Sequence, residues 1–199
     1  ERIVVITALP LYHIFSLTSN CLGMMVDGGE NILITNPRDM PGFVRELGKH
    51  RFNYITGVNT LYAGLLNTPG FADLDFSSLR LSVGGGMAVQ ESVSRRWQSV
   101  TGKPIVQGYG LTETSPVATS NLLDVTEFTG SIGLPMPSTE VRIVDPRRHV
   151  ERRPELAFED AVKVSLIAAH PAGHFGLRDF GGADPGFEAV VGLHKWGCM

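Results

Sequence analysis

Residues 105–114 read IVQGYGLTET, a short apolar run that passes into a turn with two glycines, a hydroxyl and a carboxylate. Such a run predicts a buried strand, with the turn at the point where the strand ends. Similar β-branched runs occur upstream, each separated from the next by a longer stretch with helical character. This alternation predicts an α/β fold, in which a parallel sheet is covered by helices.

The alternation predicts five strands and four helices before residue 110. The strands are expected at residues 3–7, 31–35, 54–58, 79–83 and 105–109. The helices are expected at residues 14–26, 40–50, 60–67 and 88–101. Asp39 is the expected N-cap of the second helix, and Gly102 is expected to end the fourth. Because ligands on parallel sheets bind beyond the carboxyl ends of the strands, the loops after these strands are the candidate site.

The composition excludes several classes of protein. The 199 residues are 43% apolar and 19% charged, as in a globular protein, and the net charge of −3 argues against an electrostatic nucleic-acid binder. Cys21 and Cys198 form neither a disulfide framework nor a metal knuckle, so a reducing cytoplasm is expected. The apolar region at residues 14–26 is shorter than the roughly 20 residues of a spanning helix, and no signal peptide is evident.

The turn after residue 109 carries groups suited to a charged small molecule. Glycines at 108 and 110 let the backbone approach a ligand closely, and Tyr109 offers a face for stacking. Thr112 can donate to an anion, and Glu113 can hold a hard cation such as Mg²⁺. Taken alone, the peptide can also be read as an ordinary turn between a strand and a loop.

The segment YGLTE at residues 109–113 resembles the adenylate-binding motif of the adenylate-forming superfamily, which includes acyl-CoA synthetases, luciferases and adenylation domains. Three further segments resemble motifs of this family in the same order and spacing: LPLYH at 9–13, LSVGGGM at 81–87 and TGSIGLP at 129–135. Within the superfamily, residues 1–145 are most similar to bacterial long-chain fatty-acid–CoA ligases. A chance match of four ordered motifs is not expected.

The resemblance implies a role for individual residues. Tyr109 would stack on adenine, Thr112 would bind the α-phosphate, Glu113 would ligate Mg²⁺, and His13 would stand between the acyl pocket and the approaching thiol. Thr112, Glu113 and His13 are thus the implied catalytic residues, although a lone histidine after a strand is more often a hydrogen-bonded loop residue. The other implied residues are Gly84, Gly85, Gly86, Gln107, Gly108 and Gly110 for the nucleotide, and Val58, Asn59, Gly84 and Gly108 for the acyl group.

The implied reaction uses ATP, a fatty acid and coenzyme A. The acid attacks the α-phosphate to give acyl-AMP and pyrophosphate, and the thiol of coenzyme A then displaces AMP. Such chemistry depends on positioning and on cations that offset phosphate charge. The resemblance implies a cytoplasmic protein, with peripheral association at the inner membrane surface as an alternative because the acids are lipids. Other hypotheses are a non-catalytic nucleotide- or acyl-binding remnant, and another branch of the superfamily, such as an adenylation domain or aryl–CoA ligase.

The resemblance also divides the chain. Residues 1–128 are expected to form an incomplete α/β AMP-binding subdomain, and residues 129–145 to begin a β-subdomain with a strand at 140–144. Residues 146–199 match no family pattern and are interpreted as a frameshifted or disordered tail, with helical character only at 156–169. The family's phosphate loop and its lysine-bearing C-terminal domain have no counterpart here, so we expect the isolated chain to be inactive.

Overall fold

The computed structural model describes residues 2–141 and 166–167. It divides into two compact units, Glu1–Gly133 and Leu134–Met199. None of the helices in the described ranges is long and apolar enough to cross a membrane.

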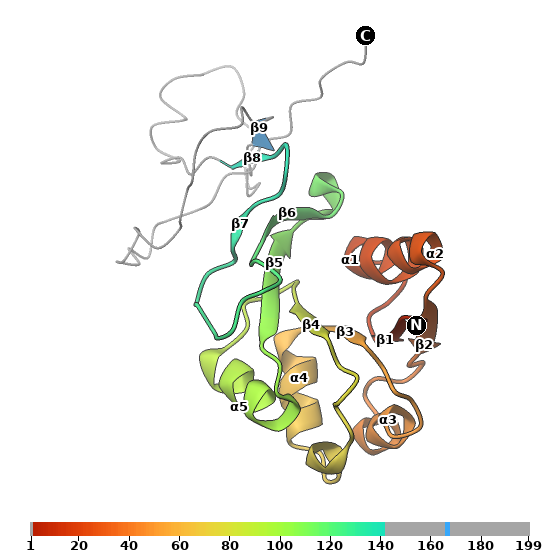
Figure 1. Ribbon diagram of the computed structural model, residues 1–199. Coiled ribbons are helices and arrows are strands. Elements are labelled where there is room, and N and C mark those ends of the chain that lie inside the picture. Colours follow the sequence, from red (N-terminus) through yellow and green to blue (C-terminus); the bar gives the residue numbers. More distant parts are fainter. Residues whose placement is uncertain (1, 142–165, 168–199) are drawn as a thin grey trace. The chain divides into compact units, whose positions relative to one another are not determined.

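The first unit is built on a sheet whose strands follow the order β2-β1-β3-β4-β5-β6 (Figure 1). The strands are β1 (Val4–Thr7), β2 (Glu30–Leu33), β3 (Tyr54–Gly57), β4 (Leu81–Gly84), β5 (Ile105–Gly110) and β6 (Val117–Ser120). All pairs from β2 to β5 are parallel, and β6 runs antiparallel to β5. The predicted α/β fold with a mostly parallel sheet is therefore confirmed.

The prediction contained no strand at β6. Ala118 and Thr119 in its middle are both buried, and the Thr119 hydroxyl donates to the Ile132 carbonyl at 3.0 Å. The strand therefore lacks the alternation of apolar and polar residues that marks a half-buried strand in sequence. It forms because the turn after β5 brings it back beside the glycine-rich end of that strand.

The helices lie close to their predicted positions. They are α1 (Ile14–Ser16), η1 (Leu17–Leu22), α2 (Gly23–Asp27), α3 (Met40–Leu47), α4 (Asn59–Leu66) and α5 (Glu91–Thr101), with short 3₁₀ turns η2 (Phe71–Asp73) and η3 (Thr112–Thr114). The predicted caps are confirmed, since Asp39 Oδ1 accepts from the Gly42 amide at 2.9 Å and α5 ends at Gly102 with φ +74°. The helix expected at 14–26 is present, but η1 in its middle is a π-helix.

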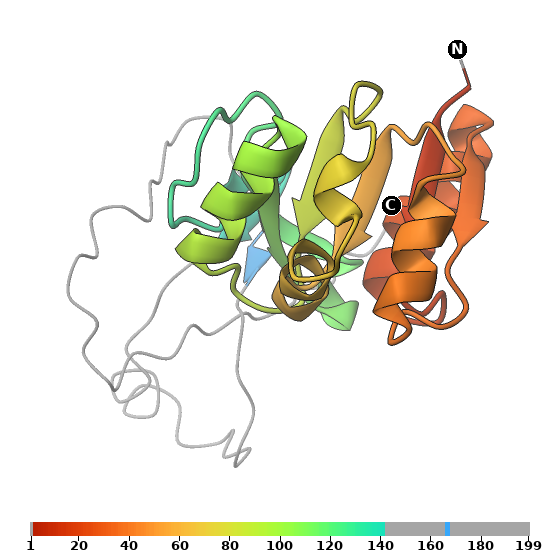
Figure 2. The same cartoon turned by 90° about the horizontal axis from the view of Figure 1, so that it is seen from below.

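Helices cover both faces of the sheet. Ile6 in β1 and Ile55 in β3 belong to the apolar core that α3, α4 and α5 share, and Figure 2 shows these three helices across one face of the strands. The next residues, Thr7 and Thr56, point to the opposite face because side chains alternate along a strand. There they contact Asn20 of η1, so the helical segment 14–27 covers that second face.

An aromatic cluster fixes the position of β4. Tyr62 and Trp97 are fully buried, and their ring centroids lie 4.6 Å apart in an edge-to-face arrangement. The Trp97 indole N–H donates to the Ser82 hydroxyl at 3.0 Å, and the Tyr62 hydroxyl donates to the Val83 carbonyl at 2.7 Å. These two bonds attach α4 and α5 to the strand that leads into the triple glycine.

The second unit is described at β7 (Leu134–Pro135), β8 (Glu140–Val141) and β9 (Leu166–Ile167). β8 and β9 pair antiparallel, and the expected β-subdomain stays a prediction. The helix expected at 156–169 is wrong at residues 166–167, because pairing with a distant strand overrides a local helical pattern. The remaining predictions for residues 142–165 and 168–199 lie outside the described residues.

A buried hydroxyl in α5 gives a test of this packing. Ser94 is fully buried, and its Oγ has no hydrogen-bond partner among the described residues. We expect Ser94→Ala to raise the free energy of unfolding by about 1 kcal/mol, because the hydroxyl loses its hydration on folding and gains no bond in return. Urea denaturation monitored by tryptophan fluorescence measures this change.

Ser82→Ala is the matched control. It makes the same substitution at a serine whose hydroxyl accepts a hydrogen bond from Trp97. It should lower the free energy of unfolding by about 1 to 3 kcal/mol, because the indole donor is then buried without a partner. Equal losses in the two variants would contradict this account of the core.

Candidate functional site

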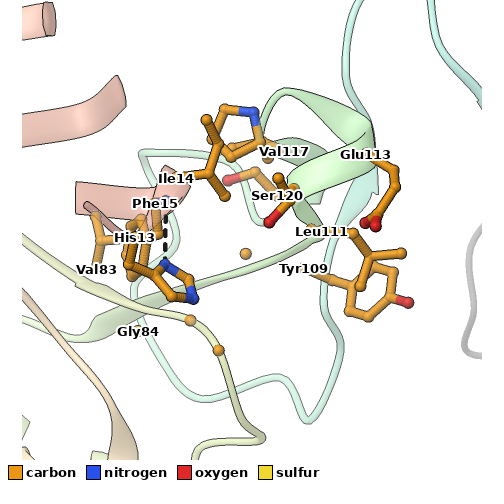
Figure 3. A pocket seen from close by; sticks show the side chains of 16 residues that line it. His13, Ile14, Phe15, Val83, Gly84, Tyr109, Leu111, Glu113, Val117 and Ser120 are labelled. Atoms are coloured by element: carbon orange, nitrogen blue, oxygen red, sulfur yellow. Dashed lines mark hydrogen bonds between the residues drawn. The ribbon is translucent and has the colours of Figure 1, made fainter. Parts of the chain in front are cut away.

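A cavity of about 330 Å³ lies beyond the carboxyl ends of β4 and β5 (Figure 3). It gathers loops that are far apart in the sequence, as expected for a parallel sheet. The predicted site residues in its lining are His13, Gly84, Gly85, Gly86, Gly108, Tyr109, Gly110, Thr112 and Glu113. The lining also includes Ile14, Phe15, Val83, Leu111, Pro116, Val117 and Ser120.

Each glycine of the loop after β4 is required for a different reason. A Cβ on Gly84 would lie 2.6 Å from Val89 Cγ2, so a side chain there would force the packing behind the strand to shift. A Cβ on Gly85 would lie 3.1 Å from Phe15 Cε1, which places the Phe15 ring directly against this glycine. Gly86 has a φ of +75°, a conformation that residues with a Cβ rarely adopt. The result is a stretch of bare backbone along one wall of the cavity.

Two predicted site residues hold the far end of this loop instead of lining the cavity. The Asn59 Oδ1 accepts from the Gln90 amide at 2.9 Å, and the Gln107 Oε1 accepts from the Val89 amide at 3.2 Å. Both side chains belong to buried residues. The structure thus gives Asn59 and Gln107 a role in fixing the loop, and their contacts with an acyl group or a nucleotide stay predictions.

Val58 lies one layer behind the glycine loop. It precedes α4 in an extended conformation, and its Cγ1 would be 3.5 Å from a Cβ on Gly86. It is not in the lining of the cavity, so the predicted contact of Val58 with an acyl chain also stays a prediction. Through Gly86, however, its side chain supports the wall from behind.

The turn after β5 presents Thr112 and Glu113, and Thr114 holds it in shape. The Thr114 hydroxyl accepts from the Leu111 amide at 2.8 Å and lies 2.6 Å from the Pro116 carbonyl, to which it can donate. These bonds close η3 on itself, so that Thr112 and Glu113 stay exposed at the cavity rim. No role was predicted for Thr114, although its position within the YGLTET segment was a signal that the turn needs a hydroxyl.

Tyr109 stands on β5 between two glycines. Partial burial raises the pKa of its phenol, so the group is neutral under ordinary conditions and the ring offers an uncharged face. Gly108 and Gly110 on either side leave the backbone open toward the cavity. In Figure 3 the Tyr109 ring and the Glu113 carboxylate lie on one side of the cavity, and His13 and Phe15 lie on the other.

His13 caps the helical segment at the opposite side of the cavity. Its Nδ1 accepts from the Phe15 amide at 3.2 Å, so the neutral ring carries its proton on Nε2. The bond is drawn as a dashed line in Figure 3. Nε2 is therefore the nitrogen of His13 that is left to donate to a ligand.

Glu113 is the one carboxylate in the lining of this cavity. The described residues contain no group of three or more His, Cys, Asp or Glu side chains that could form a complete metal cage. Mg²⁺ does not need such a cage, because it is often held by one or two carboxylates together with water and substrate phosphates. The donor set therefore fits a Mg²⁺ ion that arrives with a nucleotide.

Two of the lining residues that sequence reasoning missed, Val117 and Ser120, come from β6. Gly108 pairs with Ser120 and Gly110 pairs with Val117, with a register shift between the two pairs. This irregularity adds one residue to β6, so side chains three positions apart, Val117 and Ser120, both reach the cavity. A bulge depends on the partner strand, and no local pattern in VATS at 117–120 announces it.

Comparisons with known proteins agree with these motifs. The model of the AMP-binding enzyme family matches residues 1–155. The chain is 59% identical over 144 residues to a long-chain-fatty-acid–CoA ligase of Yersinia pestis, a match that covers 72% of this chain and 26% of the ligase. It is 32% identical over 142 residues to a feruloyl-CoA synthase of Amycolatopsis sp, covering 71% of this chain and 28% of the synthase.

Among solved structures, a benzoate CoA ligase from Burkholderia xenovorans LB400 matches with a TM-score of 0.66 and 26% identity. That match covers 73% of this chain and 30% of the benzoate ligase. The chain thus spans about a quarter of the length of the curated fatty-acid ligases it matches.

The glycines of β5 allow a test of the cavity. A Cβ on Gly110 would overlap the Pro116 carbonyl, whereas a Cβ on Gly108 would lie 3.5 Å from the Thr119 carbonyl oxygen, an ordinary contact. We expect Gly110→Ala to lower the free energy of unfolding by about 2 kcal/mol or more, and Gly108→Ala to change it by less than about 1 kcal/mol. Urea denaturation of both variants measures the difference.

Gly108→Ala should nevertheless weaken AMP binding, measured by isothermal titration calorimetry, because its methyl group enters the space that a ligand would occupy. Unchanged AMP affinity in a fully folded Gly108→Ala protein would show that the nucleotide does not use this wall.

Proposed function

The chain belongs to the AMP-binding enzyme family, and on that premise we propose that it forms part of an AMP-forming long-chain fatty-acid–CoA ligase. The observation that carries the proposal is the composition of one cavity. Residues from three of the four predicted motifs, the LPLYH loop, the triple glycine and the YGLTE turn, line it together. The first and last of these motifs lie about one hundred residues apart in the sequence.

The proposed reaction has two steps. A carboxylate oxygen of the fatty acid attacks the α-phosphorus of ATP, the bond to the β-phosphate oxygen breaks, and acyl-AMP and pyrophosphate form. The sulfur of coenzyme A then attacks the acyl carbon, and the carbon–oxygen bond to AMP breaks. Both steps develop charge on oxygen atoms, so they require hydrogen-bond donors and cations at fixed positions.

The side of the cavity formed by β5 and η3 suits the nucleotide. Tyr109 supplies a neutral ring for stacking on adenine, and the backbone of Gly84–Gly86 is bare enough to lie against the base. Thr112, in the lining of the cavity, would donate its hydroxyl to the α-phosphate. Glu113 would hold Mg²⁺, which supplies positive charge to the phosphates when bound.

The side formed by the start of the helical segment suits the acid. Ile14 and Phe15 provide apolar surface, and the Nε2–H of His13 can donate to a carboxylate or a phosphate oxygen at the boundary between the two sides. A fatty acid is the proposed substrate because the fatty-acid ligase of Yersinia pestis is 59% identical to this chain and the feruloyl-CoA synthase only 32%. Coenzyme A, a cytoplasmic location and peripheral contact with the inner membrane surface belong to the same proposal.

The role of Glu113 can be tested by nucleotide binding to the 199-residue chain. We expect Mg²⁺ to increase ATP affinity in the wild-type chain by at least about tenfold, and Glu113→Gln to abolish most of this increase. AMP binding without Mg²⁺ should change little in the variant, because adenine contacts do not involve the carboxylate. Titration calorimetry with and without Mg²⁺ measures both effects.

Glu127→Gln is the matched control, because Glu127 is also exposed but lies outside the cavity lining. It should keep the full Mg²⁺ effect. If Glu113→Gln keeps it as well, Glu113 is not the metal ligand.

The acid specificity can be tested with stable mimics of the acyl-adenylate. Palmitoyl-sulfamoyl adenosine should bind at least about tenfold more tightly than AMP, since the buried chain adds apolar contact area. Benzoyl-sulfamoyl adenosine should gain less. Tighter binding of the benzoyl compound would favour an aryl–CoA ligase, and equal binding of both mimics and AMP would favour a nucleotide-binding remnant.

A further inference from the structure

Asn20 is a fully buried polar residue in the middle of the π-helix η1. Its amide nitrogen donates to the hydroxyl of Thr7 at 2.8 Å and to the hydroxyl of Thr56 at 2.9 Å, so both of its protons are used. Thr7 ends β1 and Thr56 lies in β3, two neighbouring strands of the sheet. One side chain therefore attaches the helical segment 14–27 to two strands at once.

The same bonds extend into a network with few unused groups. The Thr7 hydroxyl donates to Asn31 Oδ1 at 2.7 Å, and Asn31 Nδ2 donates to the Asn20 carbonyl at 2.9 Å. The Ser19 hydroxyl lies 2.8 Å from Asn20 Oδ1, which can accept from it. A buried network whose members are all hydrogen-bonded is stable in one arrangement, because any shift leaves polar atoms without partners.

The π-helix explains how Asn20 reaches the sheet. Ser16, Asn20 and Met24 are the buried residues of the helical segment, and they are spaced four apart. In an α-helix with 3.6 residues per turn, positions four apart are rotated by about 40° at each step. The wider turn of a π-helix reduces this drift, so the three side chains stay on the face toward the sheet. The bonds of Asn20 hold this rotation in place.

The rotation of the segment matters because its first residues line the cavity. Phe15 lies five residues before Asn20, and its ring lies against Gly85 of the glycine loop. His13 caps the same helical turn and presents Nε2. If η1 relaxed to an ordinary α-helix, the turn that carries these two side chains would rotate relative to the glycine loop.

We propose that Asn20 is a positioning residue for the acid side of the cavity: it holds the π-turn on Thr7 and Thr56 and thereby keeps Phe15 against Gly85. Its effect on an acid rests on the proposed function, whereas its effect on Phe15 does not. A purely structural role would contribute to stability alone and would leave the position of Phe15 unchanged in any variant that folds.

Of three variants, the triple variant and Thr56→Val separate these roles, and Asn20→Ala does not. Asn20→Ala leaves two threonine hydroxyls without their donor, and it lowers stability under either role. The triple variant Asn20→Leu, Thr7→Val and Thr56→Val replaces the polar contact by an apolar one of similar volume, which restores packing without directional bonds. Thr56→Val alone removes one acceptor of the Asn20 amide. It is the variant to measure if the triple variant does not fold.

The first measurement is the nuclear Overhauser effect between the Phe15 ring protons and the Gly85 α-protons in the 199-residue chain. We expect it in the wild type, and we expect its loss in the triple variant at unchanged overall fold, with a weaker signal in Thr56→Val. Absence of the effect in the wild type, or its full retention in the folded variants, overturns the inference.

The second measurement compares affinities for palmitoyl-sulfamoyl adenosine and AMP in the same proteins. We expect the folded variants to bind the palmitoyl compound about tenfold more weakly, because small displacements of a positioning group are costly. AMP affinity should stay within about twofold, since Tyr109 and Glu113 lie on the other side of the cavity. A wild type that binds neither compound contradicts the proposed function, while loss of the Phe15 signal in the variants still supports the positioning role.

Discussion

Close packing of backbone at the ends of β4 and β5 is the constraint on which the site depends. Gly84 has the side chains of Val89 and Ile105 behind it, and Gly110 has the Pro116 carbonyl beside it, so neither position has room for a Cβ. Because packing keeps these positions free of side chains, their peptide groups are also open on the cavity side. Fold stability and an open cavity therefore both require glycine at these positions.

The sheet topology brings the chemistry together. The carboxyl ends of β1, β4 and β5 lie along one edge, and the loops that follow them carry His13, the triple glycine and Glu113. Side chains one layer behind, such as Asn59 and Gln107, bind the backbone of the glycine loop and fix its exit. Residues that resemble parts of a binding motif can thus act through the loop that they hold.

Local patterns predicted most of the first unit, and distant contacts account for what they missed. The β-branched runs, the Asp39 cap and Gly102 each have a local physical cause, and the structure contains all of them. The strand β6 and its bulge form where the glycines of β5 accept a close neighbour, and the π-helix is held by the bonds of Asn20 to two distant strands. In the same way, the pairing that makes Leu166–Ile167 a strand depends on β8, far away in the sequence.

The two sides of the cavity are supported by different parts of the fold. The side with Tyr109 and Glu113 depends on β5, whose neighbour β4 is anchored by the aromatic core on one face of the sheet. The side with Phe15 depends on a helical segment held by polar bonds on the other face. Changes in that segment can therefore alter the side with Phe15 while the side with Tyr109 and Glu113 keeps its geometry. This independence agrees with the proposed function, because the fatty-acid, feruloyl and benzoate CoA ligases that are similar to this chain are named for different acids.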